Sequence, residues 1–184
     1  LTFPQIKSCQ TGADTGFNVL AIYMYSKLAW NSELSVGNIF NEYFNAMYAE
    51  AAVPMREMFE DLRLWFARCL KDNNWSWSAN MNGSISGSME FVKQGDIVTM
   101  FRHLDEAYAK IEMYKKDPAK YASLKSHIDM EWLFPAKVSI SNDTGLFTEG
   151  QLAEIKTNFK SYVRTLGMQY IKEFTSIEPF INSL

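Results

Sequence analysis

Residues Leu20–Phe59 decide the fold class of this chain, and they read LAIYMYSKLAWNSELSVGNIFNEYFNAMYAEAAVPMREMF. The segment Phe17–Trp30 reads as a helix that is apolar on every side, with Lys27 as its only charge. Such a helix must be covered all round, by protein or by lipid. Its 14 residues rise about 21 Å, which is short of the roughly 30 Å core of a bilayer. We therefore expect protein on both of its faces and no membrane insertion.

The composition is that of a folded, mildly acidic chain. The 184 residues are 47% hydrophobic and 15% aromatic, which excludes wholesale disorder and is enough for a domain with a real core. Eighteen Lys and Arg against 21 Asp and Glu give a net charge of −3, and the sequence has no basic run. This charge pattern argues against a nucleic-acid partner and against an anionic membrane surface.

Cysteine and histidine are both scarce. Cys9 and Cys69 are too few for a disulfide framework; one bridge is compatible with the sequence, and two separate thiols are the favoured interpretation. His103 and His127 fall on separate expected helices without a Cys or His at ligand spacing. The sequence also has no Gly-rich phosphate loop and no nucleophile elbow. We therefore predict no zinc site and no cofactor.

Five further segments carry the apolar periodicity of helices that pack by one side. Each has a boundary signal: an N-cap residue, a proline in the first turn, or a glycine past the end. The expected helices are 36–48 after the N-cap Ser35, 54–72 with Pro54 in its first turn, 97–111 capped by Asp96, a helix opened by Asp117-Pro118 that Pro135 should kink or end, and 149–166 with a capping box at Thr148–Gln151 and Gly167 as its stop.

The remaining segments are short or irregular. Residues 3–9 alternate apolar and polar side chains and predict a short strand, which a turn-rich loop follows at 11–16. Residues 73–95 are rich in Asn, Ser and Gly and are interpreted as a long loop, either ordered or flexible. An extended run at 169–173 and a last helical turn at 176–179 end the chain. The prediction is a mainly α protein, a bundle of five or six helices.

Most large apolar side chains fall at inward positions of these helices. Trp30, Trp132, Tyr43 and Phe44 are assigned to the core. The ten methionines are also mostly inward, so packing explains them better than an adaptable binding surface does. The acidic residues of the third to fifth helices fall mostly on solvent faces: Glu57, Glu60, Asp61, Asp105, Glu106 and Glu112.

The order of motifs in the opening stretch resembles one family. Tyr25–Asn31 (YSKLAWN) is followed by a polar turn, a helix with paired aromatics at Tyr43-Phe44, and Tyr48–Met55 (YAEAAVPM). This order resembles the segment that joins the last barrel helix to the C-terminal helical region in α-glucuronidase-like glycoside hydrolases. The related bacterial family known as domain of unknown function 4838 is the closer match. This chain has Ala49 where the family has glycine, in the tight turn expected between two helices.

The resemblance implies that a sugar-cleaving (β/α)8 barrel of about 250 residues precedes this segment. Residues 1–31 would then be a remnant of that barrel (its last strand, loop and helix), and 32–184 would be a helical C-terminal domain. The start at Leu1 rather than at Met fits this expectation. The apolar helix would pack on the barrel by one face and on the bundle by the other. The family further implies a homodimer and a periplasmic or cell-surface location.

Few residues qualify as site candidates. Glycoside hydrolysis needs two carboxylates that flank the scissile bond, and we assign no such catalytic pair here. Asp14 lies in the loop that would face the barrel mouth, where it is either a carbohydrate contact or an ordinary turn aspartate. Trp75 and Trp77 would point the same way in an extended segment and are suited to stacking on sugar rings. The alternative, which we favour for tryptophans of a helical domain, is that both pack in the core.

The sequence therefore predicts the non-catalytic C-terminal helical region of a bacterial carbohydrate-active enzyme, which supports the barrel and takes part in dimerisation. Two alternatives stay open. One is a helical module that binds an oligo- or polysaccharide through Trp75 and Trp77. The other is a purely structural or protein-interaction bundle with no connection to sugars.

Overall fold

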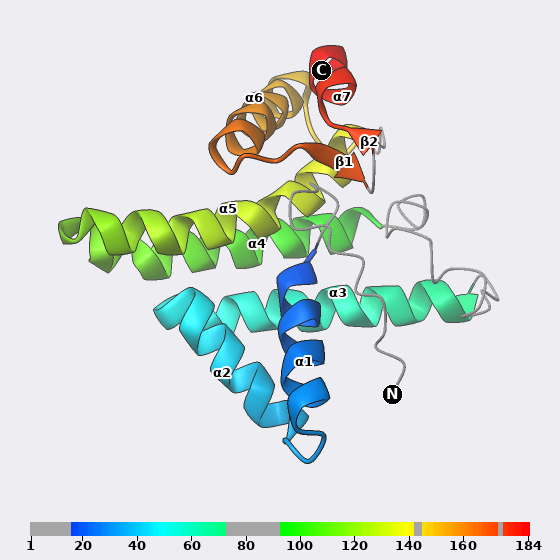
Figure 1. Cartoon of the computed structure of the whole chain (residues 1–184). Coiled ribbons are helices and arrows are strands. Elements are labelled where there is room, and N and C mark those ends of the chain that lie inside the picture. The colour runs from blue at the N-terminus through cyan, green and yellow to red at the C-terminus, as the bar shows by residue number, and fades with distance from the viewer. Residues whose placement is uncertain (1–15, 73–92, 142–144, 173–174) are drawn as a thin grey trace.

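A computed structural model describes residues 16–72, 93–141, 145–172 and 175–184 of the chain. In this part, six helices of 13 to 24 residues pack into a bundle, accompanied by a two-stranded hairpin and a short last helix (Figure 1). The prediction of a mainly α bundle is confirmed. The strand expected at 3–9 lies outside the described residues, as does nearly all of the loop at 73–95.

The helices begin and end close to the predicted residues. They are α1 (Asn18–Trp30), α2 (Val36–Tyr48), α3 (Ala52–Asp72), α4 (Gln94–Ile111), α5 (Pro118–Ser141), α6 (Glu149–Thr165) and α7 (Glu178–Ser183), with 3₁₀ turns at Ala49–Ala51 and Glu112–Lys116. Strand β1 (Tyr170–Lys172) pairs antiparallel with β2 (Thr175–Ser176). Among the described helices, none combines the length and the apolar composition that crossing a bilayer requires.

Two of the predicted boundary signals are confirmed in atomic detail. The Thr148 N–H donates to Gln151 Oε1 at 3.0 Å, and the Gln151 N–H donates to Thr148 Oγ1 at 3.3 Å, which completes a capping box at the start of α6. Gly167 adopts a φ of 66° just past the end of α6. This left-handed conformation costs glycine little, so it ends the helix there.

One boundary prediction was wrong, and at a second boundary one of the two expected outcomes does not occur. The N-cap of α4 is Lys93, and Asp96 lies inside the first turn, where its carboxylate accepts from the Lys93 N–H at 3.2 Å. Asp96 thus satisfies a free backbone donor at the helix start from within the helix. Of the two outcomes expected at Pro135, the helix end does not occur, because α5 continues to Ser141. An interior proline costs a helix about 3 kcal/mol, which the burial of residues 135–139 offsets.

The C-terminal half of α5 is the centre of the core. Between Ile128 and Ser139 every residue except Met130 is buried, including three that carry a charge or can carry one. In Figure 1, α4 and α5 lie between α3 and the unit formed by α6, α7 and the hairpin, and α1 and α2 project beyond α3 on the other side. The helical segment that is enclosed on all sides is therefore the C-terminal half of α5, whereas the sequence indicated the segment 17–30.

Side-chain burial agrees with most of the predicted core. Trp132, Tyr43 and Phe44 are buried as expected. Phe44 packs with Tyr43, Tyr48 and other aromatic rings at centroid distances of 5.5 to 6.4 Å. None of the six acidic residues assigned to solvent faces is buried. Trp30 is the exception, because 93% of it is exposed.

The tight connection from α2 to α3 forms without glycine. Ala49 has φ 48° and ψ −120°, a conformation that glycine adopts readily and that costs a residue with a Cβ atom about 1–3 kcal/mol. Tyr48 and Ala51 on either side are fully buried, and their burial holds the chain in this conformation. The turn therefore stores strain that packing overcomes.

We expect Ala49→Gly to stabilise the protein by about 1 kcal/mol, because the relief of strain exceeds the extra entropy that glycine gives the unfolded chain. Urea denaturation followed by circular dichroism measures the change as a shift in the midpoint. The matched control is Ala51→Gly, the same substitution two residues later at φ < 0, which should destabilise by about 1 kcal/mol. Equal losses of stability in both variants would contradict the assignment of strain to Ala49.

Candidate functional site

Helix α1 packs on α2 by the side that carries its only charge. Lys27 Nζ lies 2.7 Å from Glu42 Oε1 on α2 and 5.3 Å from the centroid of the Tyr23 ring. Tyr23 in turn packs on Tyr43 of α2 at a ring distance of 5.6 Å. Lys27 and Tyr23 of α1 therefore both make their contacts on the α2 side.

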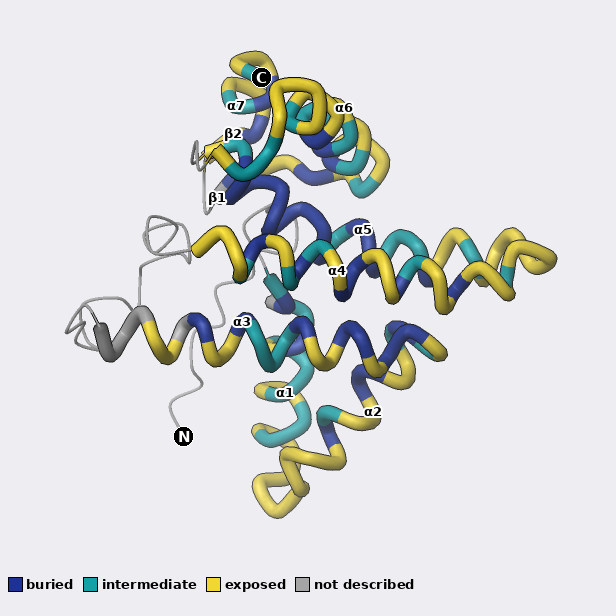
Figure 2. Tube along the Cα trace, turned by 180° about the vertical axis from the view of Figure 1, so that it is seen from behind, coloured by how far each residue is buried: buried dark blue, intermediate teal, exposed yellow. Residues whose placement is uncertain are grey.

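The opposite side of α1 is apolar and uncovered within the described part of the chain. Its residues recur at helical spacing and form what we call the outer face of α1: Ala21, Ile22, Tyr25, Leu28 and Ala29, with the polar Ser26 at its edge. Trp30, the last residue of the helix, lies beyond that edge in line with Tyr23. None of these residues is buried, and Tyr25 is 55% exposed. Figure 2 shows the intermediate and exposed colours along most of α1. The prediction that Trp30 belongs to the core is therefore wrong, because only the first turn of α1 reaches the centre of the bundle.

That first turn is anchored by Phe17. Its ring is buried against Phe59 at 5.4 Å and Phe44 at 5.9 Å, and its backbone has a φ of 57°, a strained value for a bulky residue. The preceding Gly16 lies so close to α3 that a Cβ atom there would meet Leu62 Cδ2 at 3.0 Å. The chain thus enters α1 through a narrow, tightly packed site.

A buried carboxylate completes this anchor. The Phe17 N–H donates to Glu131 Oε2 at 2.7 Å, and the Tyr48 hydroxyl donates to Glu131 Oε1 at 3.3 Å. Burial raises the pKa of the Glu131 carboxyl to about 7, although both hydrogen bonds act in the opposite direction. Burial likewise raises the pKa of the Tyr43 and Tyr48 hydroxyls, with a contribution from the nearby Glu131 charge. Glu131 therefore joins α1, α2 and α5 and sits near its ionisation point at neutral pH.

This carboxylate makes the stability of the protein depend on pH. The unfolded chain loses the Glu131 proton near pH 4.5 and the folded chain near pH 7, so the folded state becomes less stable as pH rises between these values. The difference is on the order of 3 kcal/mol. Glu131→Gln keeps one oxygen acceptor for the Phe17 N–H and offers an amide N–H to the Tyr48 hydroxyl oxygen, and it should remove this fall in stability.

The measurement is urea denaturation at several pH values from 4.5 to 8. Glu154→Gln, an exposed change of the same charge on α6, should leave the pH profile of the wild type unchanged. If the free energy of unfolding of the wild type, relative to that of Glu131→Gln, did not change between pH 5 and 7, the pKa of the Glu131 carboxyl would not be raised by burial.

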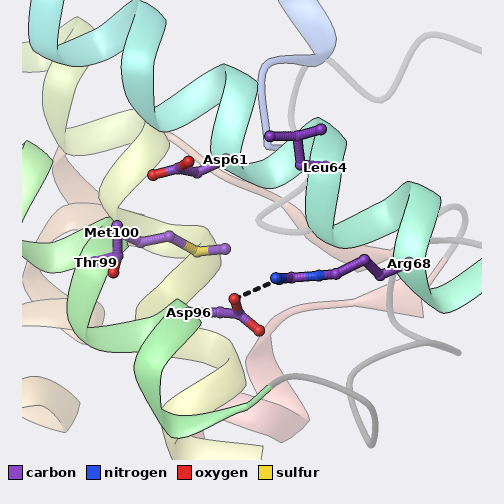
Figure 3. A pocket seen from close by; sticks show the side chains of 6 residues that line it. All are labelled: Asp61, Leu64, Arg68, Asp96, Thr99 and Met100. Carbon is purple, nitrogen blue, oxygen red and sulfur yellow. Dashed lines mark hydrogen bonds and ion pairs between the residues drawn. The ribbon is translucent and has the colours of Figure 1, made fainter.

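A second polar region follows the seam between α3 and α4. At one point it opens into a pocket of about 260 Å³ that is lined by Asp61, Leu64, Arg68, Asp96, Thr99 and Met100 (Figure 3). Arg68 from α3 and Asp96 from α4 form an ion pair of 2.6 Å there. Both helices contribute an acid and the pocket is open to solvent, so the seam is suited to binding a cation or a cationic group.

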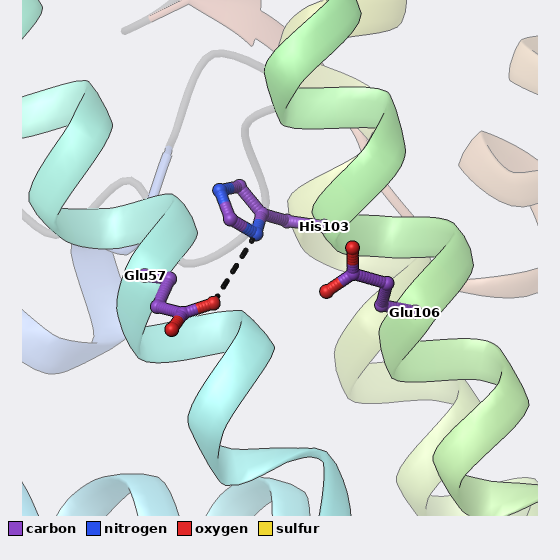
Figure 4. A group of neighbouring side chains, drawn as sticks. All are labelled: Glu57, His103 and Glu106. Carbon is purple, nitrogen blue, oxygen red and sulfur yellow. Dashed lines mark ion pairs between the residues drawn. The ribbon is translucent and has the colours of Figure 1, made fainter.

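Beside this pocket lies His103, the only histidine on α4. It is 3% exposed, and its Nε2 atom lies 3.0 Å from Asp61 Oδ2 on α3. Its Nδ1 atom lies 3.7 Å from Glu57 Oε2, and Glu106 lies next to them on α4 (Figure 4). Sequence reasoning considered only a second His or Cys as a partner of His103. The signal it missed was the carboxylate three residues further along the same helix.

The other predicted site residues stay untested. Asp14, Trp75 and Trp77 lie outside the described residues, as does Cys9, and nothing is described of the Cys69 side chain. Compared with known proteins, the chain matches no family, no curated protein and no solved structure.

Proposed function

We propose that this chain is a non-catalytic helical region that supports a neighbouring domain through the outer face of α1. In this proposal the neighbouring domain is the (β/α)8 barrel of a glycoside-hydrolase-like protein of the α-glucuronidase type, and α1 is the last helix of that barrel. The observation that carries the proposal is the uncovered, largely apolar outer face of α1, on which Tyr25 is 55% exposed. The adjoining Trp30 at the end of the helix is 93% exposed.

The arrangement of these side chains supports an interface rather than scattered surface residues. Single exposed hydrophobic residues are ordinary, but a contiguous apolar patch marks a contact surface. On α3, by contrast, the exposed Val53 and Leu64 are interspersed with charged residues, which include Arg56, Glu57 and Arg63. The outer face of α1 contains no charged residue at all, because Lys27 is turned toward α2. Covering a surface of this composition with another apolar surface is favourable in water.

Two features favour a barrel as the occupant. The motif that resembles the glycoside hydrolases contains Tyr25 and Leu28, which belong to the outer face, and Lys27, which binds α2. The motif thus divides between the two sides of one helix, as expected of a helix packed between a barrel and a bundle. The second feature is Ala49, whose backbone has a conformation suited to the glycine of the family pattern. A homodimer through the same face is the competing occupant.

The purified chain should show no turnover of aryl glycosides or glucuronoxylan fragments, since the proposal assigns the catalytic carboxylates to the barrel. A chromogenic assay at high protein concentration measures this. Turnover that disappears when a carboxylate of this chain is changed to the amide would overturn the non-catalytic assignment.

The outer face itself is tested by Tyr25→Ser combined with Trp30→Ser. This double variant should fold normally and should bind a hydrophobic fluorescent dye severalfold less than the wild type, because exposed aromatic surface is removed. The matched control is Val53→Ser with Met113→Ser, two side chains that are each 65% exposed on other elements. Equal dye binding by the wild type and the α1 variant would exclude a docking face on α1.

The occupant is tested separately. Sedimentation of the wild type and the Tyr25→Ser, Trp30→Ser variant shows whether two copies cover the face. The coding sequence immediately upstream of Leu1 shows whether a barrel pattern of alternating strands and helices is present. A monomeric wild type with a barrel pattern upstream supports the proposal. An unrelated upstream sequence would overturn the barrel assignment and leave only the docking face.

A further inference from the structure

Two packed helices bring one imidazole and two carboxylates to a single point of the α3–α4 seam. His103 and Glu106 lie three residues apart on α4, so their side chains leave the same face of that helix. Glu57 reaches the same point from α3 (Figure 4). One ligand atom of each residue lies within 4.8 Å of the other two. Helical bundles commonly form metal sites in this way, with inward side chains from facing helices.

The imidazole of His103 is the group that requires a partner. Only 3% of His103 is exposed. Its Nδ1 atom forms no hydrogen bond within the described residues. The nearest carboxylate oxygen, Glu57 Oε2, is 3.7 Å away, which is beyond hydrogen-bond distance. A buried polar atom without a partner costs free energy, and a metal ion bound to its lone pair removes that cost.

Asp61 orients the His103 ring so that its Nδ1 atom can bind a metal ion. A carboxylate can only accept, so the His103 Nε2–H donates to Asp61 Oδ2 at 3.0 Å and the lone pair of a neutral ring is left on Nδ1. Metal-binding histidines are typically oriented by such a carboxylate on the second nitrogen. The Arg102 guanidinium lies 3.4 Å from Nε2, a longer contact than the 3.0 Å to Asp61 Oδ2, so the carboxylate determines which nitrogen carries the proton. Arg102 donates to Glu106 Oε1 at 2.9 Å, which leaves the second carboxylate oxygen of Glu106 for a ligand bond.

We propose that Glu57, His103 and Glu106 bind a divalent transition-metal ion, zinc by preference, with a further coordination position open to solvent. Two ligands on one tetrahedral zinc ion lie about 3.4 Å apart, so the ligand atoms, which lie within 4.8 Å of one another, must move closer together. Glu57 and Glu106 have side chains that are 56% and 45% exposed, and they can rotate to do so. One nitrogen and two carboxylate ligands suit Zn²⁺ and other transition metals, whereas Mg²⁺ and Ca²⁺ prefer oxygen ligands alone.

The test is calorimetric titration of the full chain with Zn²⁺ in a Cys9→Ser, Cys69→Ser background, which removes the thiols as competing ligands. We expect one ion per chain, a rise in the melting temperature with Zn²⁺, and no binding of Mg²⁺ at the same concentration. The chain has two histidines, so the NMR signals of their rings identify the ligand. Zn²⁺ should shift the signals of His103 and leave those of His127, whose Nδ1 lies 2.7 Å from the Met47 carbonyl oxygen, in place.

Variants separate the ligands from their surroundings. Glu57→Gln and Glu106→Gln are exposed and nearly isosteric, so they should fold and should each weaken Zn²⁺ binding at least tenfold. Asp61→Asn, which changes only the orienting group, should weaken it about tenfold. Glu60→Gln removes the same charge from α3 one position before Asp61, outside the cluster, and should leave the affinity within twofold of the parent.

Two results would overturn the site. The first is a folded parent protein that binds neither Zn²⁺ nor Co²⁺ below about 100 µM. The second is binding that leaves the His103 signals unmoved or that the combined Glu57→Gln, Glu106→Gln variant retains at full strength. Neither result tests the outer face of α1, so the metal site and the proposed function can be refuted independently of each other.

Discussion

The hydrogen bonds to the buried carboxylate of Glu131 connect three helices that are distant in the sequence. Glu131 lies in the enclosed half of α5, where it accepts from the first turn of α1 through Phe17 and from the end of α2 through Tyr48. A buried acid is costly unless its oxygens are satisfied. Removing any one of the three helices would leave donors or acceptors unpaired, so these contacts set where α1 leaves the core.

The position of α1 follows from this anchor. Phe17 and Leu20 are buried at its start, whereas Trp30 at its end is 93% exposed. The helix therefore extends outward from a fixed base, with Lys27 holding its inner side to Glu42 of α2. An apolar side that is rigidly held and left open suits a surface for another domain, since little conformational entropy is lost when it is covered.

The bundle presents two surfaces of opposite chemistry. The outer face of α1 is apolar and without charge, and the α3–α4 seam is lined by carboxylates around the buried His103. Both arise from positions where the packing rule for helices is broken: apolar side chains that point outward, and a polar ring that points inward. Such departures are where functional sites are expected, because selection for stability alone would remove them.

Helix boundaries were determined by the sequence, because a capping box at Thr148 and a glycine after α6 act on neighbouring backbone groups. The mainly α class followed from periodicity for the same local reason. Tertiary structure alone decided that the C-terminal half of α5, not α1, is enclosed on every side. Both are rich in apolar residues, and a sequence states how apolar a helix is but not which neighbours cover it. The pairing of His103 with Glu57 likewise required the packing of α3 on α4, since these residues are 46 positions apart along the chain.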